Sequence, residues 1–161
     1  MFVRALLAFL ALPGVVAGLV PALIVYGGAK GHGGSAAGFG LAAVGLVLLL
    51  SCVREFFVSG KGTLAPWDPP KHLVAVGLYR YVRNPMYIAV LMIVLGWALA
   101  FGSAWLALYS LLLAVAFHLR VLLHEEPWLR RHFGPEWEAY SSSVRRWLPR
   151  FRIGEHDGRH D

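Results

Sequence analysis

Four long apolar runs, separated by polar segments, dominate the pattern of hydrophobic and polar positions along this chain of 161 residues. A helix of about 20 apolar residues is long enough to cross the roughly 30 Å hydrocarbon layer of a membrane. The pattern predicts an all-α polytopic membrane protein with about four transmembrane helices, at residues 4–26, 39–58, 85–101 and 105–123. The first run contains Pro13-Gly14, where we predict a kink, and the third is short for a perpendicular span.

The chain changes character after residue 124, where large apolar side chains alternate with charged ones. Their spacing of three and four residues places the apolar groups on one face of short helices, with a break at Gly134-Pro135. We predict a C-terminal amphipathic cytoplasmic helical segment that lies on the membrane surface, followed by a disordered tail at residues 154–161. Residues 1–153 are predicted to form a single membrane-embedded domain.

Local signals give three further predictions. The uncharged turn at residues 101–104 predicts an antiparallel hairpin of the third and fourth helices. Asn84 followed by Pro85 predicts the start of the third helix, with Asn84 as its N-cap. Gly40 and Gly45 predict a small-residue face on the second helix that suits close packing.

Composition agrees with a membrane protein, because 58% of the residues are hydrophobic, only 15% are charged, and the mean hydropathy is +0.60. The net charge of +6 comes from basic residues that flank the apolar runs. This placement favours anionic lipid headgroups as partners and predicts no binding of nucleic acid. The single cysteine, Cys52, lies in an apolar run and is expected to be a small buried hydrophobe.

The distribution of basic residues also predicts the orientation. They gather between the second and third runs and after the fourth, while the first connection carries only Lys30 and the last carries none. The positive-inside rule therefore places both termini, and the two polar segments described next, on the cytoplasmic side. The protein is expected in the inner membrane if it is bacterial.

Two polar segments interrupt the apolar pattern, at residues 77–87 and 124–127. The first crowds arginines and tyrosines around an Asn-Pro step, and the second reads His-Glu-Glu-Pro. We expect the two segments to close on each other around a charged small molecule, with acidic groups facing its cations and arginines facing its anion. No metal site is expected, because His124 and the glutamates lack the His-x-x-x-His spacing that places two ligands on one helical face.

The motifs occur in the order Gly77-x-Tyr79-x-Tyr81-x-Arg83-Asn84-Pro85-x-Tyr87, Glu125-Glu126-x-x-Leu129 and Arg146-Trp147-x-Pro149. This order resembles the isoprenylcysteine carboxyl methyltransferase family and the related bacterial and phospholipid methyltransferases of membranes. The resemblance covers about residues 71–150, half of the chain. It implies in-line methyl transfer from S-adenosylmethionine, held beneath the C-terminal segment, to a lipophilic acceptor that enters from the bilayer. Such an acceptor is an isoprenylcysteine-like carboxylate, a phospholipid or a small lipophilic molecule.

The resemblance also implies the residues of the site. The implied cofactor-binding residues are Lys71, His72, Leu73, Val74, Tyr79, Asn84, Pro85, Met86, Tyr87, Glu125 and Glu126. The implied catalytic residues are Arg83, Arg120 and Glu125. Two positions depart from the family pattern. Asn84 stands where the family usually has histidine and cannot act as an acid or base, and Arg120 is one residue off the family's spacing to the glutamate.

Two other functions remain open from the sequence. A membrane reductase of sterols or other lipids that uses NADPH shares a similar Arg-His-Pro-x-Tyr motif, although such proteins generally have more spans. A non-catalytic helical membrane protein would need no cytoplasmic cluster of charges. The identity of the methyl acceptor and the oligomeric state are not predicted.

Overall fold

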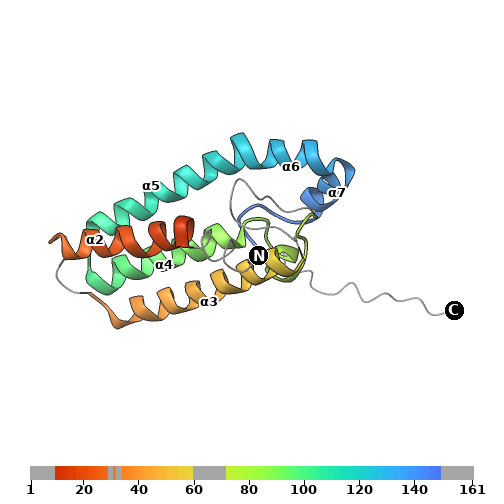
Figure 1. Ribbon diagram of the computed structural model, residues 1–161. Coiled ribbons are helices and arrows are strands. Elements are labelled where there is room, and N and C mark those ends of the chain that lie inside the picture. The colour runs from red at the N-terminus through yellow and green to blue at the C-terminus, as the bar shows by residue number, and fades with distance from the viewer. Residues whose placement is uncertain (1–9, 29–30, 32–33, 60–71, 150–161) are drawn as a thin grey trace.

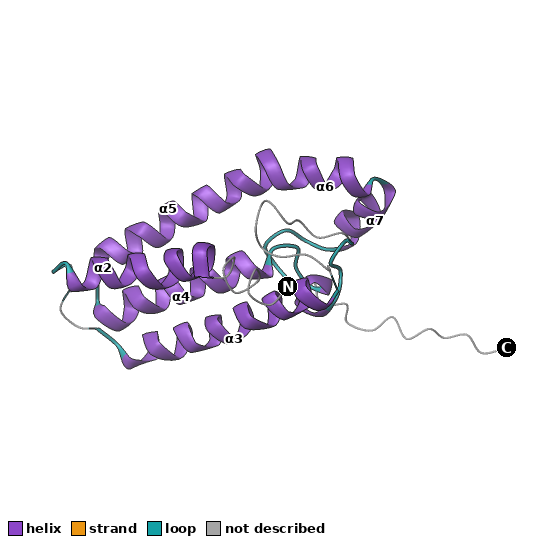
Figure 2. Cartoon of the chain, in the orientation of Figure 1, coloured by secondary structure: helices purple, strands orange, loops and turns teal. Residues whose placement is uncertain are grey.

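The structure, a computed structural model, describes residues 10–28, 31, 34–59 and 72–149. Within these residues the chain is helical and contains no strand, as Figure 2 shows. The prediction of an all-α fold is therefore confirmed. The start of the first predicted helix, the candidate residue Lys71 and the tail at residues 154–161 lie outside the described residues.

The helical elements follow the apolar pattern closely. They are η1 (Leu10–Leu19), α2 (Val20–Tyr26), α3 (Ala36–Val58), η2 (Gly77–Arg80), α4 (Pro85–Phe101), α5 (Ala104–Arg120), η3 (Val121–Glu125), α6 (Glu126–Phe133) and α7 (Pro135–Ser143). Elements η1 and η3 have the wide turns of a π-helix, and η2 is a short 3₁₀ turn. The bounds of α4 are those predicted, and α3 begins at residue 36 rather than 39.

The first helix departs from α-geometry around its proline. Pro13 lies inside η1, and the chain returns to α-geometry only at Val20, with Pro21 in the first turn of α2. A proline inside a helix cannot donate a hydrogen bond and its ring crowds the preceding turn, so the regular pattern is interrupted there. The interruption predicted at Pro13 is present as a widened helix.

Helix α4 forms the centre of the bundle. It packs against α3 on one side and α5 on the other, while η1 and α2 also contact it (Figure 1). Its residues Ala89, Val90 and Val94 are almost completely buried, together with Leu49 of α3. Between helices in a membrane such packing rests on close van der Waals contact, and it fixes the position of the polar start of α4.

Glycines allow α3 and α4 to approach closely. A Cβ atom added at Gly45 would lie 2.8 Å from the carbonyl oxygen of Ala89, and one at Gly96 would lie 2.7 Å from the carbonyl oxygen of Gly38. The small-residue face predicted on α3 is therefore present at Gly45. The prediction for Gly40 is wrong, because Gly40 is exposed and has no atom of another element within 4 Å of such a Cβ.

The connection between α4 and α5 is the predicted tight turn. Gly102 adopts a left-handed conformation with φ of 58°, which glycine accepts without steric cost. The buried hydroxyl of Ser103 then accepts a hydrogen bond from the backbone N–H of Leu106 at 3.4 Å and caps α5. This turn makes α4 and α5 an antiparallel hairpin, as predicted.

In the part of the chain that the structure describes, two helices are long and apolar enough to cross a membrane, Ala36–Glu55 and Ala104–Phe133. Only 22% and 17% of their most apolar windows are buried, so neither is the core helix of a soluble protein. The apolar helices Pro13–Tyr26 and Pro85–Phe101 are shorter, and the prediction of four spans stays a prediction.

The second long helix corrects the predicted end at residue 123. Helical conformation continues from α5 through η3 and α6 to Phe133, where Gly134 with φ of 49° ends it (Figure 1). The predicted break at Gly134-Pro135 is confirmed, but α6 extends α5 and is not a separate short helix. Helix α7 then folds back toward the start of α4.

Candidate functional site

The polar side chains gather at the end of the bundle where α4 begins and α5 ends. Residues 144–147, here called the strap, run beside residues 82–84. Val82 pairs with Arg145 in an isolated parallel bridge, and the backbone N–H of Arg83 donates to the carbonyl oxygen of Arg145 at 2.9 Å. The strap therefore brings the C-terminal segment onto the first of the two polar segments.

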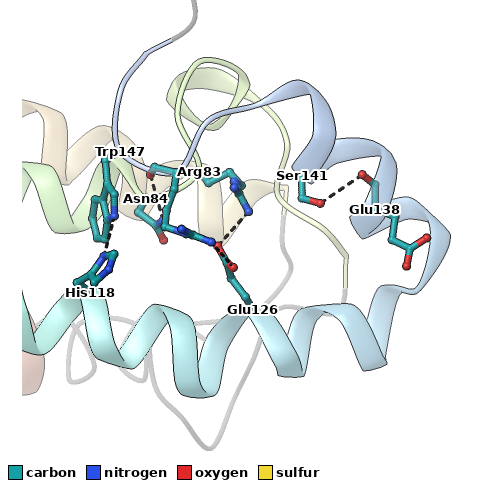
Figure 3. Close-up of polar contacts among 8 residues, drawn as sticks. Arg83, Asn84, His118, Glu126, Glu138, Ser141 and Trp147 are labelled. Carbon is teal, nitrogen blue, oxygen red and sulfur yellow. Dashed lines mark hydrogen bonds and ion pairs between the residues drawn. The ribbon is translucent and has the colours of Figure 1, made fainter.

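Glu126 binds two arginines from different parts of the chain. Arg146 of the strap donates from Nε to Oε1 and from Nη2 to Oε2 of Glu126, both at 2.7 Å, and Arg83 donates from Nη1 to Oε1 at 2.9 Å. Figure 3 shows Arg83 and Glu126 pointing toward each other from facing elements. Only 14% of the Arg83 side chain and 18% of the Glu126 side chain are exposed, so solvent screens this ion pair little.

The charges of this cluster do not balance. Two guanidinium groups meet one carboxylate, which leaves one positive charge in excess. Burial lowers the pKa of Arg83 from its ordinary value, and Glu126 counteracts part of that effect. Nε of Arg83 is buried and has no hydrogen-bond partner among the described residues. The guanidinium carbon of Arg83 also lies 5.6 Å from the ring centre of Trp137, within the range of a cation–π contact.

The adjacent Glu125 has different partners. Arg120 Nε donates to Glu125 Oε1 at 2.9 Å and to the Tyr87 hydroxyl oxygen at 3.2 Å. The Tyr87 hydroxyl donates in turn to Glu125 Oε1, and the Tyr87 ring stacks on Phe117 at a distance of 4.3 Å between ring centres. The side chains of Arg120 and Glu125 are 53% and 30% exposed, so this cluster is more open than that of Glu126.

The wide turn η3 explains why Arg120 reaches Glu125. In a regular α-helix, residues five positions apart point about 140° away from each other. A π-turn closes its hydrogen bond over five residues instead of four and so takes up the extra residue. The one-residue departure of Arg120 from the family spacing is thus absorbed by η3. The sequence gives no sign of this widening.

Asn84 occupies the predicted N-cap position of α4, but its side chain makes no capping hydrogen bond. Its Nδ2 donates instead to the carbonyl oxygen of Arg146 in the strap, at 3.1 Å. The start of α4 was predicted correctly and the capping role of Asn84 was wrong. One residue further along the strap, Trp147 Nε1 donates to Nδ1 of His118 on α5 at 3.1 Å (Figure 3).

The side chain of Tyr79 faces the interior. It is 6% exposed and packs in a cluster with Cys52 of α3 and Val74, while its carbonyl oxygen accepts a hydrogen bond from the Tyr140 hydroxyl at 2.7 Å. Burial raises the pKa of Tyr79 well above 10.0, so its hydroxyl is neutral. The buried position predicted for Cys52 is confirmed.

The other predicted cofactor-binding residues lie at different depths. His72 is exposed, Leu73 is half-buried, and Met86 packs on the cluster of Cys52 and on the core of α4. Pro85 is buried at the first position of α4. The structure thus brings Arg83, Asn84 and Glu126 together around the strap. A second group, Tyr87, Arg120 and Glu125, meets around η3. Among the described residues, His72 forms no hydrogen bond or ion pair with either group.

Sequence reasoning assigned no role to several residues that build this site. They are Arg146, Trp147, His118, Trp137 and Tyr140. Arg146 and Trp147 belong to the C-terminal motif, so their spacing was a signal, but the partner of each depends on the path of the strap. Among the residues that the structure describes, no three His, Cys, Asp or Glu side chains gather to hold a metal ion.

The fold and the site define a helical membrane protein with a cluster of paired charges at one end of its helices. The model of the phospholipid methyltransferase family matches residues 34–136, which include α3, α4, α5 and both glutamates. The chain belongs to this family of membrane methyltransferases, which is of the isoprenylcysteine carboxyl methyltransferase type.

A protein of Haemophilus influenzae described only as uncharacterized is 37% identical to this chain over 65 residues. The match covers 39% of this chain and the whole of the relative. No solved structure shows significant similarity.

Proposed function

We propose that this chain is an integral membrane methyltransferase that uses S-adenosylmethionine to methylate a lipophilic acceptor. The observation that carries the proposal is the meeting of two charged clusters at one end of the bundle, one more open, in which Arg120 pairs with Glu125, and one with excess positive charge at Arg83. Membership of a methyltransferase family supports the reaction class. The position of the site at the end of apolar helices supports a lipophilic acceptor, which would be a lipid, a lipid-linked molecule or a small lipophilic molecule.

The residues of the site fit the methyl donor. Adenosylmethionine has a sulfonium and an ammonium group, which suit the half-exposed carboxylate of Glu125. It also has a carboxylate, which suits the unpaired Nε of Arg83 and the excess positive charge of its cluster. Asn84 and Tyr87 lie between these two charged groups along α4 and complete the proposed binding surface.

When bound, adenosylmethionine would supply an activated methyl group: an acceptor nucleophile would bond to the methyl carbon in line as the carbon–sulfur bond breaks and S-adenosylhomocysteine leaves, without a metal or a covalent enzyme intermediate. The chain contributes alignment and a water-poor, pre-arranged set of charges. Arg120 holds the Glu125 carboxylate and the Tyr87 hydroxyl in one orientation. Asn84 donates to the strap and supplies no base, so a proton of the acceptor must pass to another group or be absent at the start.

We also propose four spans with both termini and the site in the cytoplasm, within one domain of residues 1–153. The length of the helix that begins at Ala104 supports this topology. At about 1.5 Å per residue, Glu125 lies roughly 32 Å along the helix from Ala104, close to the thickness of the hydrocarbon layer. The site would therefore lie at the membrane surface, where a water-soluble donor meets an acceptor dissolved in the bilayer.

Calorimetric binding to the detergent-solubilised full chain tests the function. We expect micromolar binding of adenosylmethionine by the wild type, and a Glu125→Gln change should weaken it tenfold or more, about 1.4 kcal/mol. Glu138→Gln, a change at an exposed position of α7, is the matched control and should leave binding unaltered. Folded wild-type protein that binds no adenosylmethionine would refute the proposal. Binding of NADPH alone would point to a reductase, and binding of neither ligand to a non-catalytic protein.

A further inference from the structure

The two adjacent glutamates have separate sets of partners. We propose that they have different roles. Glu126 is a positioning residue that acts through Arg146 to hold the strap in place, whereas Glu125 is the glutamate of the pair that contacts the reactants. The inference rests on the proposed function and deepens it, because it assigns a role to Arg146 and removes Glu126 from the residues that contact the methyl donor.

Both carboxylate oxygens of Glu126 are already engaged. Oε1 accepts from Arg146 Nε and Arg83 Nη1, and Oε2 accepts from Arg146 Nη2. The fork of Arg146 on Glu126 has the two-bond geometry that makes arginine–carboxylate pairs strong and directional. A further ligand at Glu126 would have to displace one of these charge-assisted bonds.

Glu125 presents the opposite situation. Its bonds with described residues, from Arg120 and Tyr87, both go to Oε1, and its side chain is 30% exposed against 18% for Glu126. One carboxylate oxygen therefore remains available on the open side of the site. The wide turn η3 ends at Glu125 and α6 begins at Glu126, so neighbouring residues point to different clusters.

Arg146 connects Glu126 to the rest of the site through the strap. Its carbonyl oxygen accepts from Asn84, and the neighbouring carbonyl of Arg145 accepts from the backbone of Arg83. The side chain of Arg146 thus fixes the stretch of backbone on which Arg83 and Asn84 depend for their positions. The pKa of Arg146 is raised, mainly by its hydrogen bonds to Glu126, so the pair stays charged throughout the working range of pH.

A double-mutant cycle tests this role, with adenosylmethionine binding measured by calorimetry on the full chain in detergent. The variants are wild type, Glu126→Gln, Arg146→Met and the double change. We expect about tenfold weaker binding for each single variant, and the double variant should bind no more weakly than Glu126→Gln alone, because both changes remove one shared interaction. If Glu126 contacts the donor itself, the two effects multiply to about a hundredfold, which would overturn the proposal.

Two further variants separate positioning from loss of charge or of folding. Arg145→Met removes an exposed charge from the neighbouring strap position and should leave binding unchanged. Arg146→Lys keeps the charge without the fork and should fall between wild type and Arg146→Met. An Arg146→Lys variant that binds as tightly as the wild type would show that charge alone suffices and would contradict a role of the fork in positioning.

Amide hydrogen exchange of the peptide that contains Arg83 gives a readout that needs no ligand. We expect faster exchange at the Arg83 amide in Glu126→Gln and in Arg146→Met, and wild-type exchange in Glu125→Gln and Arg145→Met. Unchanged exchange in Arg146→Met would overturn the inference even if adenosylmethionine binds. Conversely, a wild type that does not bind adenosylmethionine refutes the proposed function, while the exchange data still decide whether Glu126 and Arg146 seat the strap.

Discussion

The close approach of α3 and α4 makes a sharp prediction about two glycines of the same helix. Gly45 of α3 faces α4, and a Cβ atom at this position would lie 2.8 Å from the carbonyl oxygen of Ala89 and 3.0 Å from the backbone nitrogen of Ile93. Gly40, five residues earlier in α3, has open space at the same position. Replacing each glycine by alanine adds one methyl group, inside the interface at Gly45 and outside it at Gly40.

The expected magnitude follows from these distances. The normal contact distance between a carbon atom and a carbonyl oxygen is about 3.3 Å or more, so a methyl group at Gly45 must push α3 and α4 apart by roughly 0.5 Å. The atoms in contact are mainly backbone and cannot rotate away. A gap of about 0.5 Å forfeits about a quarter of each dispersion contact along the interface, and overpacking of this kind costs about 1–3 kcal/mol. Both substitutions gain up to about 1 kcal/mol of helix propensity, which cancels in their comparison.

Thermal unfolding of the purified chain in detergent measures the difference. Gly45→Ala should be less stable than Gly40→Ala by about 1–3 kcal/mol, while Gly40→Ala should equal or exceed the wild type. Equal stability of the two variants would refute the reasoning, because it would mean that α3 and α4 do not meet at Gly45. A larger loss in Gly40→Ala than in Gly45→Ala would mean that the opposite face of α3 is packed.

Two further predictions concern the turn and the strap region. Ser103→Ala removes the cap that accepts from Leu106 and should cost about 0.5–2 kcal/mol in the same unfolding assay, whereas the exposed Ser142→Ala should cost little. Burial raises the pKa of Tyr140, as it does that of Tyr79, above the ordinary value of 10.0. Both hydroxyl groups are neutral in the folded protein, so their contribution to the free energy of unfolding is fully present below about pH 10 and is lost as the pH rises beyond it. Tyr140→Phe should therefore lose less stability than the wild type as the pH rises above about 10. An unchanged loss of stability at alkaline pH would contradict the role given to the buried Tyr140 hydroxyl.

The strongest local signals predicted the fold correctly. Asn84-Pro85 and the turn at Gly102 are short-range features, and they located both ends of α4 because proline and glycine act on their own backbone. The small-residue pattern of α3 was correct at Gly45 and wrong at Gly40, since residues five positions apart on an α-helix point about 140° away from each other and do not share a face.

The contacts of the site were less accessible from sequence. Asparagine is a common N-cap residue, yet the side chain of Asn84 donates to the carbonyl oxygen of Arg146, 62 residues away, because the strap places this acceptor beside it. The wide turn η3 was not predicted, since residues 121–123 only continue the apolar run of α5, and the polar residues His124 and Glu125 mark the end of that run without indicating a wider turn. Both cases depend on tertiary packing, which local propensity does not contain.

The uninterrupted helix Ala104–Phe133 spans about 45 Å, roughly half as long again as the hydrocarbon layer, whereas the 17-residue α4 spans about 26 Å. Hydrophobic mismatch depends on the apolar stretch alone. Residues 104–123 of the long helix span about 30 Å and match the hydrocarbon layer, whereas the shorter α4 would thin the lipid around it. Glu125 is carried on the long helix and Tyr87 on the short one. On the proposed topology, a change in bilayer thickness therefore displaces Glu125 and Tyr87 by different amounts, and lipid chain length becomes a variable of the geometry of the proposed site.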